Sequence, residues 1–244
     1  MLLDGKVALI TGAGGVLGSA ISNAFVNQGC HVMLADISQE SIYTTIQTIS
    51  ETKNVGSHII DITSNDEPKN TIEAVFSRFK KIDFLITAAG VLKRNPIHKI
   101  TDDELKMVFD VNFNFVFQLC RIAIPLMESQ GSIVTLASLS AHTGRAFSSH
   151  YAASKGAIVA LTKSIATESA PNIRANCIPP GFVKTPLSNV ILKEEHDQQI
   201  SSIPLRRFGE PSEIGNVAVF LCSNWSSYMT GQTLHVNGGM YSSG

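Results

Sequence analysis

The stretch that decides the fold is "TGAGGVLG", residues Thr11–Gly18, which holds four glycines in eight residues. It follows a short apolar run, "KVALI" at Lys6–Ile10, and precedes a helix-like pattern that extends to Gln28. A glycine-rich turn between a strand and a helix commonly binds a phosphate through the backbone N–H groups at the start of the helix. The usual fingerprint G-x-G-x-x-G fails here, because Leu17 stands where its third glycine belongs. The loop therefore predicts nucleotide binding through an altered motif.

Short apolar runs alternate with longer amphipathic segments along the rest of the chain. The predicted strands are Val7–Ile10, His31–Ala35, His58–Ile60, Ile82–Ile86, Ser132–Leu136 and Arg174–Ile178, with a last one near Thr233–Val236. The predicted helices are Val16–Gln28, Ser38–Thr52, Asp66–Phe79, Thr101–Ser129, Tyr151–Ser169 and Glu210–Ser223. Such alternation is typical of a parallel sheet with right-handed crossovers. We therefore expect a single-domain α/β fold over residues 1–244, a doubly wound parallel sheet of the Rossmann type with helices on both faces.

One late segment, Gly181–Arg207, departs from this alternation and holds Pro186 and Pro204. Because it follows a strand end, residues 182–207 are a candidate flap over a bound substrate. An exposed helix with no gating role is the alternative.

The composition restricts the classes of partner. Hydrophobic residues make up 44% of the chain and charged residues 16%, and the formal net charge is -1. This balance is typical of a soluble globular protein and gives no bulk attraction to nucleic acid or anionic membranes. The four cysteines show no C-x-x-C spacing, no run of 18 apolar residues is present, and no leader precedes the first strand. We therefore expect a cytoplasmic protein with free thiols that acts on a small molecule.

Small or polar residues follow each predicted strand, at the edge where open parallel sheets bind their ligands. In chain order they are the glycine loop, Asp36, Asp61, Thr87–Gly90, Ser138 and Pro179–Pro186. Asp36 is the most informative, because a carboxylate there accepts hydrogen bonds from the adenosine ribose and repels the 2'-phosphate of NADP. No Lys or Arg flanks it, so it predicts NAD. The alternative is that Asp36 caps the helix that begins near Ser38.

The stretch "YAASK" places Tyr151 and Lys155 four residues apart. On a helix this spacing puts both side chains on one face, with the ammonium near the phenol oxygen. A free tyrosine has a pKa of about 10, and a nearby cation lowers it. Lys155 is therefore expected to make Tyr151 usable as a general acid and base near neutral pH.

In their order along the chain, these motifs resemble the short-chain dehydrogenase/reductase family over nearly the whole sequence. The shared features are the glycine loop, Asp61, "AAG" at Ala88–Gly90, Asn112 in "VNFNFVF", Ser138 placed 13 residues before Tyr151, "YAASK", "PPGFVKTP" and the ending "TGQTLHVNGG". The resemblance implies hydride transfer between a nicotinamide and a carbinol or carbonyl carbon, without a metal.

The resemblance also implies the site residues. The catalytic tetrad is Asn112, Ser138, Tyr151 and Lys155. Tyr151 exchanges a proton with the substrate oxygen, and Ser138 donates a hydrogen bond to it. Lys155 also holds the nicotinamide ribose, and Asn112 holds a water for proton relay. The NAD site comprises Gly12, Gly14, Gly15, Val16, Leu17, Gly18, Asp36, Asp61, Ile62, Ala88, Ala89, Gly90, Tyr151, Lys155, Pro180, Gly181, Val183 and Thr185.

Two positions depart from the family pattern. In the family the loop usually reads T-G-x-x-x-G-x-G, and here Val16 occupies the position of the middle glycine. A β-branched residue disfavours positive φ and blocks close approach to the pyrophosphate, but Gly14 and Gly15 supply backbone freedom beside it. Thr87 replaces the common Asn before "AAG" and is expected to loosen the support of the fourth strand.

Two loops near the predicted crevice carry cations. Lys93 and Arg94 follow the fourth strand, and "LSAHTGRAFSSH" adds His142, Arg145 and His150. Arg94, His142 and Arg145 are candidate substrate residues, which favours a hydroxylated or anionic substrate such as a sugar, polyol or sugar acid. The alternative is that Lys93 and Arg94 are solvated surface charges. The histidines have no metal-ligand spacing, so no metal is expected.

The main interpretation is an NAD-dependent alcohol dehydrogenase or ketone reductase for such a polar substrate. A reductase of 3-oxoacyl groups on a carrier protein or coenzyme A is the first alternative, because "IPLRRFGEPSEIGNVAVFLCS" also resembles that branch. Asp36 disfavours the NADPH of biosynthesis, and the turn "MESQGS" lacks basic residues for docking an acidic carrier. Arg206 and Arg207 are an alternative basic patch for such docking. A catalytically silent NAD-binding scaffold is the second alternative, because Val16 alters the loop. The resemblance implies a homotetramer.

Overall fold

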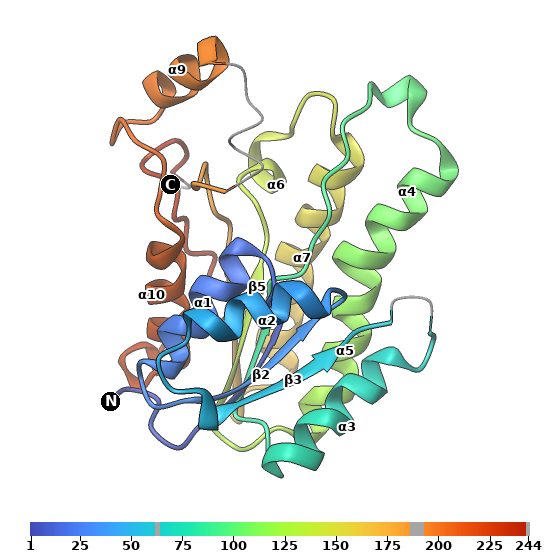
Figure 1. Cartoon of the computed structure of the whole chain (residues 1–244). Coiled ribbons are helices and arrows are strands. Elements are labelled where there is room, and N and C mark those ends of the chain that lie inside the picture. Colours follow the sequence, from blue (N-terminus) through green and yellow to red (C-terminus); the bar gives the residue numbers. More distant parts are fainter. Residues whose placement is uncertain (62–63, 186–192, 243–244) are drawn as a thin grey trace.

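The computed structural model of the protein describes residues 1–61, 64–185 and 193–242. A parallel sheet of six strands lies at its centre, in the order β3-β2-β1-β4-β5-β6 (Figure 1). The strands are β1 Val7–Thr11, β2 His31–Asp36, β3 Val55–Ile59, β4 Phe84–Thr87, β5 Gly131–Leu136 and β6 Ile173–Ile178. The strand order reverses between β1 and β4, which opens a crevice at their carboxyl ends. The predicted doubly wound parallel sheet is confirmed.

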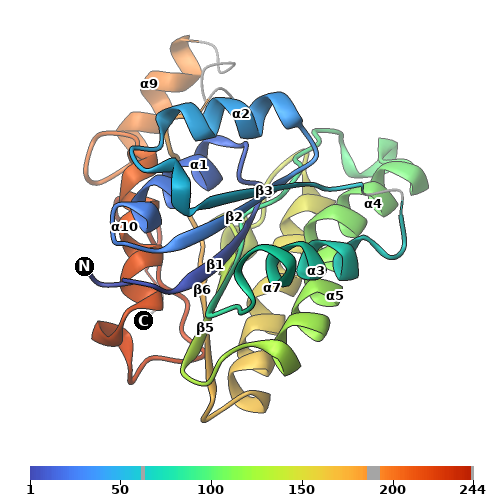
Figure 2. The same cartoon turned by 60° about the horizontal axis from the view of Figure 1, so that its bottom comes forward.

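Helices cover both faces of the sheet. They are α1 Val16–Val26, α2 Gln39–Thr48, α3 Glu67–Phe79, α4 Asp102–Phe109, α5 Phe115–Ala123, α6 Ser140–Thr143, α7 Ser149–Glu168, α9 Lys193–Ser202 and α10 Pro211–Cys222. Figure 2 shows α1, α2 and α10 on one side of the strands and α3, α5 and α7 on the other. Side chains of β1 alternate between the layers: Ala8 and Ile10 join one core, Val7 and Leu9 the other. This period of two explains why β1 is buried along its whole length.

The predicted helix Thr101–Ser129 is divided in the structure. One π-helical turn, Asp110–Asn114, joins α4 to α5, and a 3-10 turn, Ile124–Leu126, ends the run. The end comes earlier than predicted because Pro125 has no backbone N–H to continue the helical ladder. A π turn accommodates an extra residue inside a helix and frequently occurs at a functional site. This turn contains Asn112.

The last predicted strand, Thr233–Val236, is wrong as a regular strand. It forms isolated bridges beside β6, pairing Thr233 with Cys177 and Val236 with Pro180. Just before the first bridge, side chains take the place of backbone partners: Ala175 N–H donates to Thr230 Oγ1, and Gln232 N–H donates to Asn176 Oδ1. A regular ladder therefore does not extend in this direction. Among the other strands, β3 begins three residues before the predicted His58.

The predicted flap, residues 182–207, is described only in part, because residues 186–192 lie outside the described residues. Its two ends are paired with each other: Gly209 N–H donates to Phe182 O at 2.9 Å, and Lys184 N–H donates to Gly209 O at 3.0 Å. Leu205 N–H bonds to Gly238 O at 3.1 Å. The described ends are therefore anchored to the body of the protein, and the gating role stays a prediction.

By length and composition alone, the helical run Asp102–Leu126 is apolar enough to cross a membrane. In the structure it packs against α3 and α7. A helix of a protein interior passes the same test of composition.

Candidate active site

The glycine loop has no room for a Cβ against neighbouring backbone at two positions. Gly12 has a φ of +67°, and a Cβ there would lie 2.5 Å from the backbone N of Ala89. A Cβ at Gly18 would lie 2.1 Å from Gly12 O. Both distances are far below van der Waals contact, so no other residue fits. Ala89 follows β4, and the loop therefore packs tightly on the neighbouring strand end.

Val16 is compatible with this loop. Gly15 is the N-cap of α1, and Val16 is the first residue of the helix. Positive φ is found at Gly12 and not at Val16. The first turn of α1 holds no acidic residue, and Gly15 provides no side-chain cap. The helix N-terminus therefore offers backbone N–H groups and a positive dipole end that suit a phosphate.

Asp36 ends β2 and faces this loop. Its Oδ2 accepts a hydrogen bond from Gly14 N–H at 2.9 Å, and its Oδ1 accepts one from Ser38 N–H at 3.1 Å. The N-cap of α2 is Ser38, whose hydroxyl accepts from Ser41 N–H at 3.2 Å. The alternative role of Asp36 as the helix cap is therefore wrong. The carboxylate keeps further lone pairs for a ligand.

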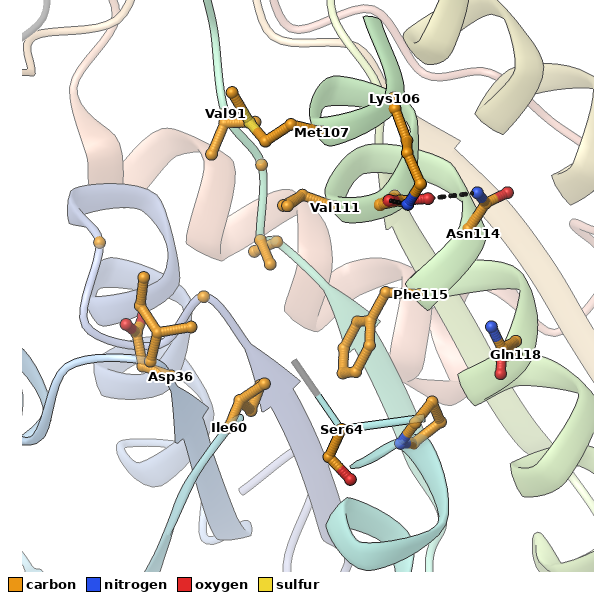
Figure 3. Close-up of a pocket in the computed structure, with 18 of the residues that line it drawn as sticks. Asp36, Ile60, Ser64, Val91, Lys106, Met107, Val111, Asn114, Phe115 and Gln118 are labelled. Atoms are coloured by element: carbon orange, nitrogen blue, oxygen red, sulfur yellow. Dashed lines mark hydrogen bonds and ion pairs between the residues drawn. The ribbon is translucent and has the colours of Figure 1, made fainter. Parts of the chain in front are cut away.

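A cavity of about 620 Å³ lies beside the loop (Figure 3). Gly12, Gly15, Asp36, Ala88, Ala89 and Gly90, all predicted cofactor residues, line it. In Figure 3, Asp36 and Ile60 lie across the cavity from Val111 and Phe115 of the long helical run. These last three were not predicted, although Val111 stands beside Asn112 in the sequence. The predicted Ile62 lies outside the described residues.

This cavity and the loop fit a dinucleotide. Tight backbone approach at Gly12, an uncapped helix start, a carboxylate at the end of β2 and a cavity of this size are the features that such a ligand needs. Lys106, a cation in the lining, is paired with Asp110, which also accepts a hydrogen bond from Asn114.

Asn112 is buried in the π turn, and its amide is fully engaged. Oδ1 accepts from Val91 N–H at 2.8 Å, while Nδ2 donates to Val91 O and to Ser154 Oγ, both at 3.0 Å. The side chain thus fastens the segment after β4 to α7. A Cβ at Gly90 would lie 3.2 Å from Lys155 Nζ and 3.3 Å from Asn112 Oδ1, so these groups converge on Gly90. The predicted relay water stays a prediction.

Thr87 occupies the second departure from the family pattern. It is buried in β4, in register with Thr11 on one side and Thr135 on the other. Among the described residues, the hydroxyls of Thr11 and Thr87 have no hydrogen-bond partner, whereas Thr135 bonds Thr162 at 2.7 Å. Unpaired buried hydroxyls cost stability. This cost supports the expectation that Thr87 weakens the support of β4, which stays a prediction.

Ser138 and Tyr151 meet at the crevice. Ser138 follows β5, Tyr151 lies in the first turn of α7, and the Ser138 hydroxyl lies close enough to the phenol to act on its pKa. Burial raises the pKa of Tyr151, while the neighbouring Ser138 hydroxyl and the charge of Arg145 act to lower it.

Lys155 is buried one turn further along α7. Its Nζ donates to Leu136 O at 2.9 Å, and burial lowers its pKa to about 8. The expectation that Lys155 lowers the pKa of Tyr151 is wrong for this arrangement, because Ser138 and Arg145 supply the lowering interactions. The ammonium points toward the end of β5 instead.

A second cavity, of about 390 Å³, includes Ser138 in its lining. Arg94 and Arg145, two predicted substrate residues, line it as well, with Phe147 and Met240. Nothing in the sequence marked Phe147 or Met240, which come from a loop and from the C-terminal segment. Polar and cationic groups therefore surround the entrance to Ser138.

His142 does not join this cavity lining. Its ring packs on His235 and Tyr241, with centroid distances of 4.6 and 5.2 Å. His142 in the short helix α6 therefore packs on the C-terminal segment. Its assignment to the substrate is unsupported by this geometry.

The predicted residues after β6 lie at the border of the second cavity. Pro180 and Gly181 line it, and Gly181 N–H donates to Val236 O at 2.9 Å. Val183 is buried and bridges Gly209. Within the described part of the chain, no group of three or more His, Cys, Asp and Glu side chains is placed to hold a metal ion.

Fold and site define an α/β oxidoreductase with a dinucleotide crevice. A family model described as enoyl-(acyl carrier protein) reductase matches residues 12–241. The 3-oxoacyl-(acyl-carrier-protein) reductase FabG of Thermotoga maritima is 34% identical, over 98% of this chain and 99% of that protein. FabG of Staphylococcus aureus strain Mu50 is 35% identical, over 97% and 98%.

A solved structure from Brucella melitensis, titled short-chain dehydrogenase/reductase, glucose/ribitol dehydrogenase, superposes with a TM-score of 0.95. It is 35% identical and covers 99% of both chains. The chain belongs to the short-chain dehydrogenase/reductase family. It is an oxidoreductase that uses a nicotinamide cofactor.

Proposed function

We propose that the protein reduces the 3-oxo group of an acyl thioester with NADH. The observation that carries the proposed reaction is the position of Ser138 beside the buried phenol of Tyr151, close enough to act on its pKa. Ser138 lines the cavity that also holds Arg94 and Arg145, and Lys155 lies one turn beyond Tyr151. The names of the FabG relatives favour the thioester over the sugar of the sequence-based interpretation.

The nicotinamide, when bound, supplies the hydride that goes to the carbonyl carbon. Tyr151 gives its phenolic proton to the carbonyl oxygen, which completes the alcohol. Ser138 donates a hydrogen bond to the same oxygen and orients it toward Tyr151. Lys155, held by Leu136 O, binds the ribose beside the nicotinamide.

Asp36 supports NADH over NADPH. Its carboxylate is held in place by two backbone N–H groups, those of Gly14 and Ser38. A carboxylate fixed at the end of β2 accepts hydrogen bonds from the ribose hydroxyls and repels a 2'-phosphate. Lys106, a cation that lines the same cavity, is already paired with Asp110.

The arginines at the second cavity suit the phosphate of a phosphopantetheine arm, which the thioester carries at the far end from its 3-oxo group. Arg94 and Arg145 present forked N–H donors that match phosphate oxygens. The turn "MESQGS", Met127–Ser132, contains no basic residue, which favours a coenzyme A thioester over an acidic carrier protein.

A polar sugar or polyol is the second candidate substrate. It is favoured by the glucose/ribitol dehydrogenase title of the Brucella melitensis structure, and the same arginines suit a sugar acid. The silent scaffold is disfavoured, because Val16 is accommodated and Ser138 lies beside Tyr151.

The test is an assay of NADH oxidation with acetoacetyl coenzyme A, a ketose and a keto sugar acid. We expect turnover of the thioester, which Tyr151→Phe abolishes. Turnover of the sugars but not of the thioester would contradict the proposed substrate and favour the sugar or polyol. If the protein binds NADH but turns over none of these substrates, the catalytically silent scaffold becomes the favoured interpretation.

We further propose one structural unit over residues 1–244, a substrate flap at 182–207, and a homotetramer in the cytoplasm. Leu105, Phe117 and Leu126 are exposed along the helical run of α4 and α5, which supports an interface there. Light scattering after gel filtration measures the assembly, and a monomer would contradict the tetramer.

A further inference from the structure

A buried histidine directly precedes Tyr151 and takes no part in the chemistry above. His150 is the second residue of α7, and its side chain is 1% exposed. Among the described residues, neither ring nitrogen has a hydrogen-bond partner. The carboxylate of Glu104 lies close by, with Oε1 3.6 Å from His150 Nε2. A buried polar group without a partner costs about 1–3 kcal/mol, so this position needs an explanation.

Glu104 connects His150 to the loop after β4. Its Oε2 accepts a hydrogen bond from Asn95 Nδ2 at 2.7 Å. Asn95 N–H donates to Phe147 O at 2.8 Å, which leads back to the chain three residues before His150. We call these four residues, Asn95, Glu104, Phe147 and His150, the brace. The brace joins α4, the start of α7 and the loop after β4.

The brace borders the second cavity. Arg94, next to Asn95, lines that cavity together with Phe147 and Ser138. Phe147 has a φ of +60°, a conformation that is rare for a bulky residue and must be held by its surroundings. Its carbonyl is held by Asn95. A parallel tie, from Ser148 Oγ to Lys93 O at 2.9 Å, fastens the same two segments.

We propose that His150 is a positioning residue for the reaction: through Glu104 and Asn95 it sets Arg94 and Phe147 relative to the phenol of Tyr151. The inference rests on the proposed function, because Arg94 and Phe147 line the proposed substrate cavity. The separation of 3.6 Å exceeds an ordinary N–H···O hydrogen bond by about 0.7 Å. At this distance the imidazole still contacts the Glu104 carboxylate and restricts its movement, and Glu104 in turn restricts Asn95.

Three variants separate this role from packing. His150→Leu keeps most of the volume and cannot donate, whereas His150→Gln keeps a donor. His98→Leu is the matched control, because His98 is exposed in the turn Ile97–Lys99 of the same loop. Since misplacement by about 1 Å costs on the order of 100-fold in rate, we expect His150→Leu to lower kcat/KM for acetoacetyl coenzyme A at least tenfold. The Kd for NADH should stay within about twofold, because the brace does not touch the first cavity.

A rescue and a substrate-free readout decide the proposal. His150→Gln should regain most of kcat/KM, and His98→Leu should equal the wild type. Hydrogen exchange at residues 93–95 should accelerate in His150→Leu only, since Glu104 and Asn95 then move more freely and the bond from Asn95 N–H to Phe147 O opens more often. Wild-type kcat/KM in His150→Leu would overturn the proposal, and so would a Gln variant no better than Leu.

Two further outcomes are distinguishable. If the wild type turns over no thioester, the proposed function fails, while the exchange measurement still decides the brace. If His150→Leu does not fold, Asn95→Leu cuts the brace at its half-buried end and must show the same loss of kcat/KM. Normal kcat/KM and normal exchange in that variant would overturn the proposal.

Discussion

The buried charge of Lys155 should make the protein less stable than a neutral variant. Burial lowers the pKa of Lys155 from its ordinary 10.5 to about 8. At about 1.4 kcal/mol per pH unit, the charged form costs the folded state roughly 3 kcal/mol at pH 7. Because the folded pKa is the lower one, the unfolded chain binds more protons between pH 8 and 10.5. Wild-type stability should therefore rise with pH across that window.

Lys155→Met removes the charge and keeps much of the side-chain volume. Loss of the hydrogen bond to Leu136 O costs about 1 kcal/mol. The free energy of unfolding at pH 7 should thus increase by about 2 kcal/mol. At pH 9.5 the remaining cost of the charge is about 1.4 kcal/mol, so the gain should fall close to zero.

Urea unfolding followed by far-UV circular dichroism at the two pH values measures this difference. Lys163→Met is the control, because Lys163 is exposed on the same helix and its removal should change stability by less than about 0.5 kcal/mol. A Lys155→Met protein that is less stable than the wild type at pH 7 would refute the reasoning. A gain that is equal at both pH values would do so as well.

Three other substitutions test the site. Tyr151→Phe should lower turnover by about 10²–10⁴-fold while nicotinamide fluorescence reports unchanged NADH binding; retained turnover would remove the proposed acid. Asp36→Ala should narrow the ratio of NADH to NADPH affinity about tenfold, or 1.4 kcal/mol, and an unchanged ratio in the same titration would return Asp36 to a structural role. Gly12→Ala should lower the unfolding free energy by about 1–3 kcal/mol and weaken NADH binding, since its Cβ would lie 2.5 Å from Ala89 N; wild-type stability and affinity would contradict the packing argument.

The sheet and its crevice could be predicted from the sequence because their signals are local. Alternating apolar runs fix the strands, and Gly12 and Gly18 mark contacts that only glycine permits. The π turn at Asp110–Asn114 could not be predicted, because a shift of one hydrogen bond leaves the apolar pattern of the helix unchanged. The irregular end at Thr233–Val236 depends on the side chain of Asn176, which is far away in sequence.

Side-chain direction was the weaker part of the site prediction. Helical spacing places Tyr151 and Lys155 on one face, but the ammonium bonds Leu136 O of a neighbouring strand. His142 and Arg145 are three residues apart, yet one packs on His235 while the other lines the cavity with Ser138. Such differences arise from contacts between distant segments, which spacing does not encode.

Unfavourable features of the described structure gather at the crevice. Lys155 is a buried charge held by one carbonyl, and Thr11 and Thr87 end their strands with unpaired hydroxyls. Phe147 beside the second cavity adopts a left-handed conformation. At the opposite end of the sheet, the buried carboxylate of Asp83 is paired with the ammonium of Lys6 and with Val7 N–H. The sheet is stable enough to hold the strained edge, so substitutions that relieve the strain should stabilise the fold and reduce turnover.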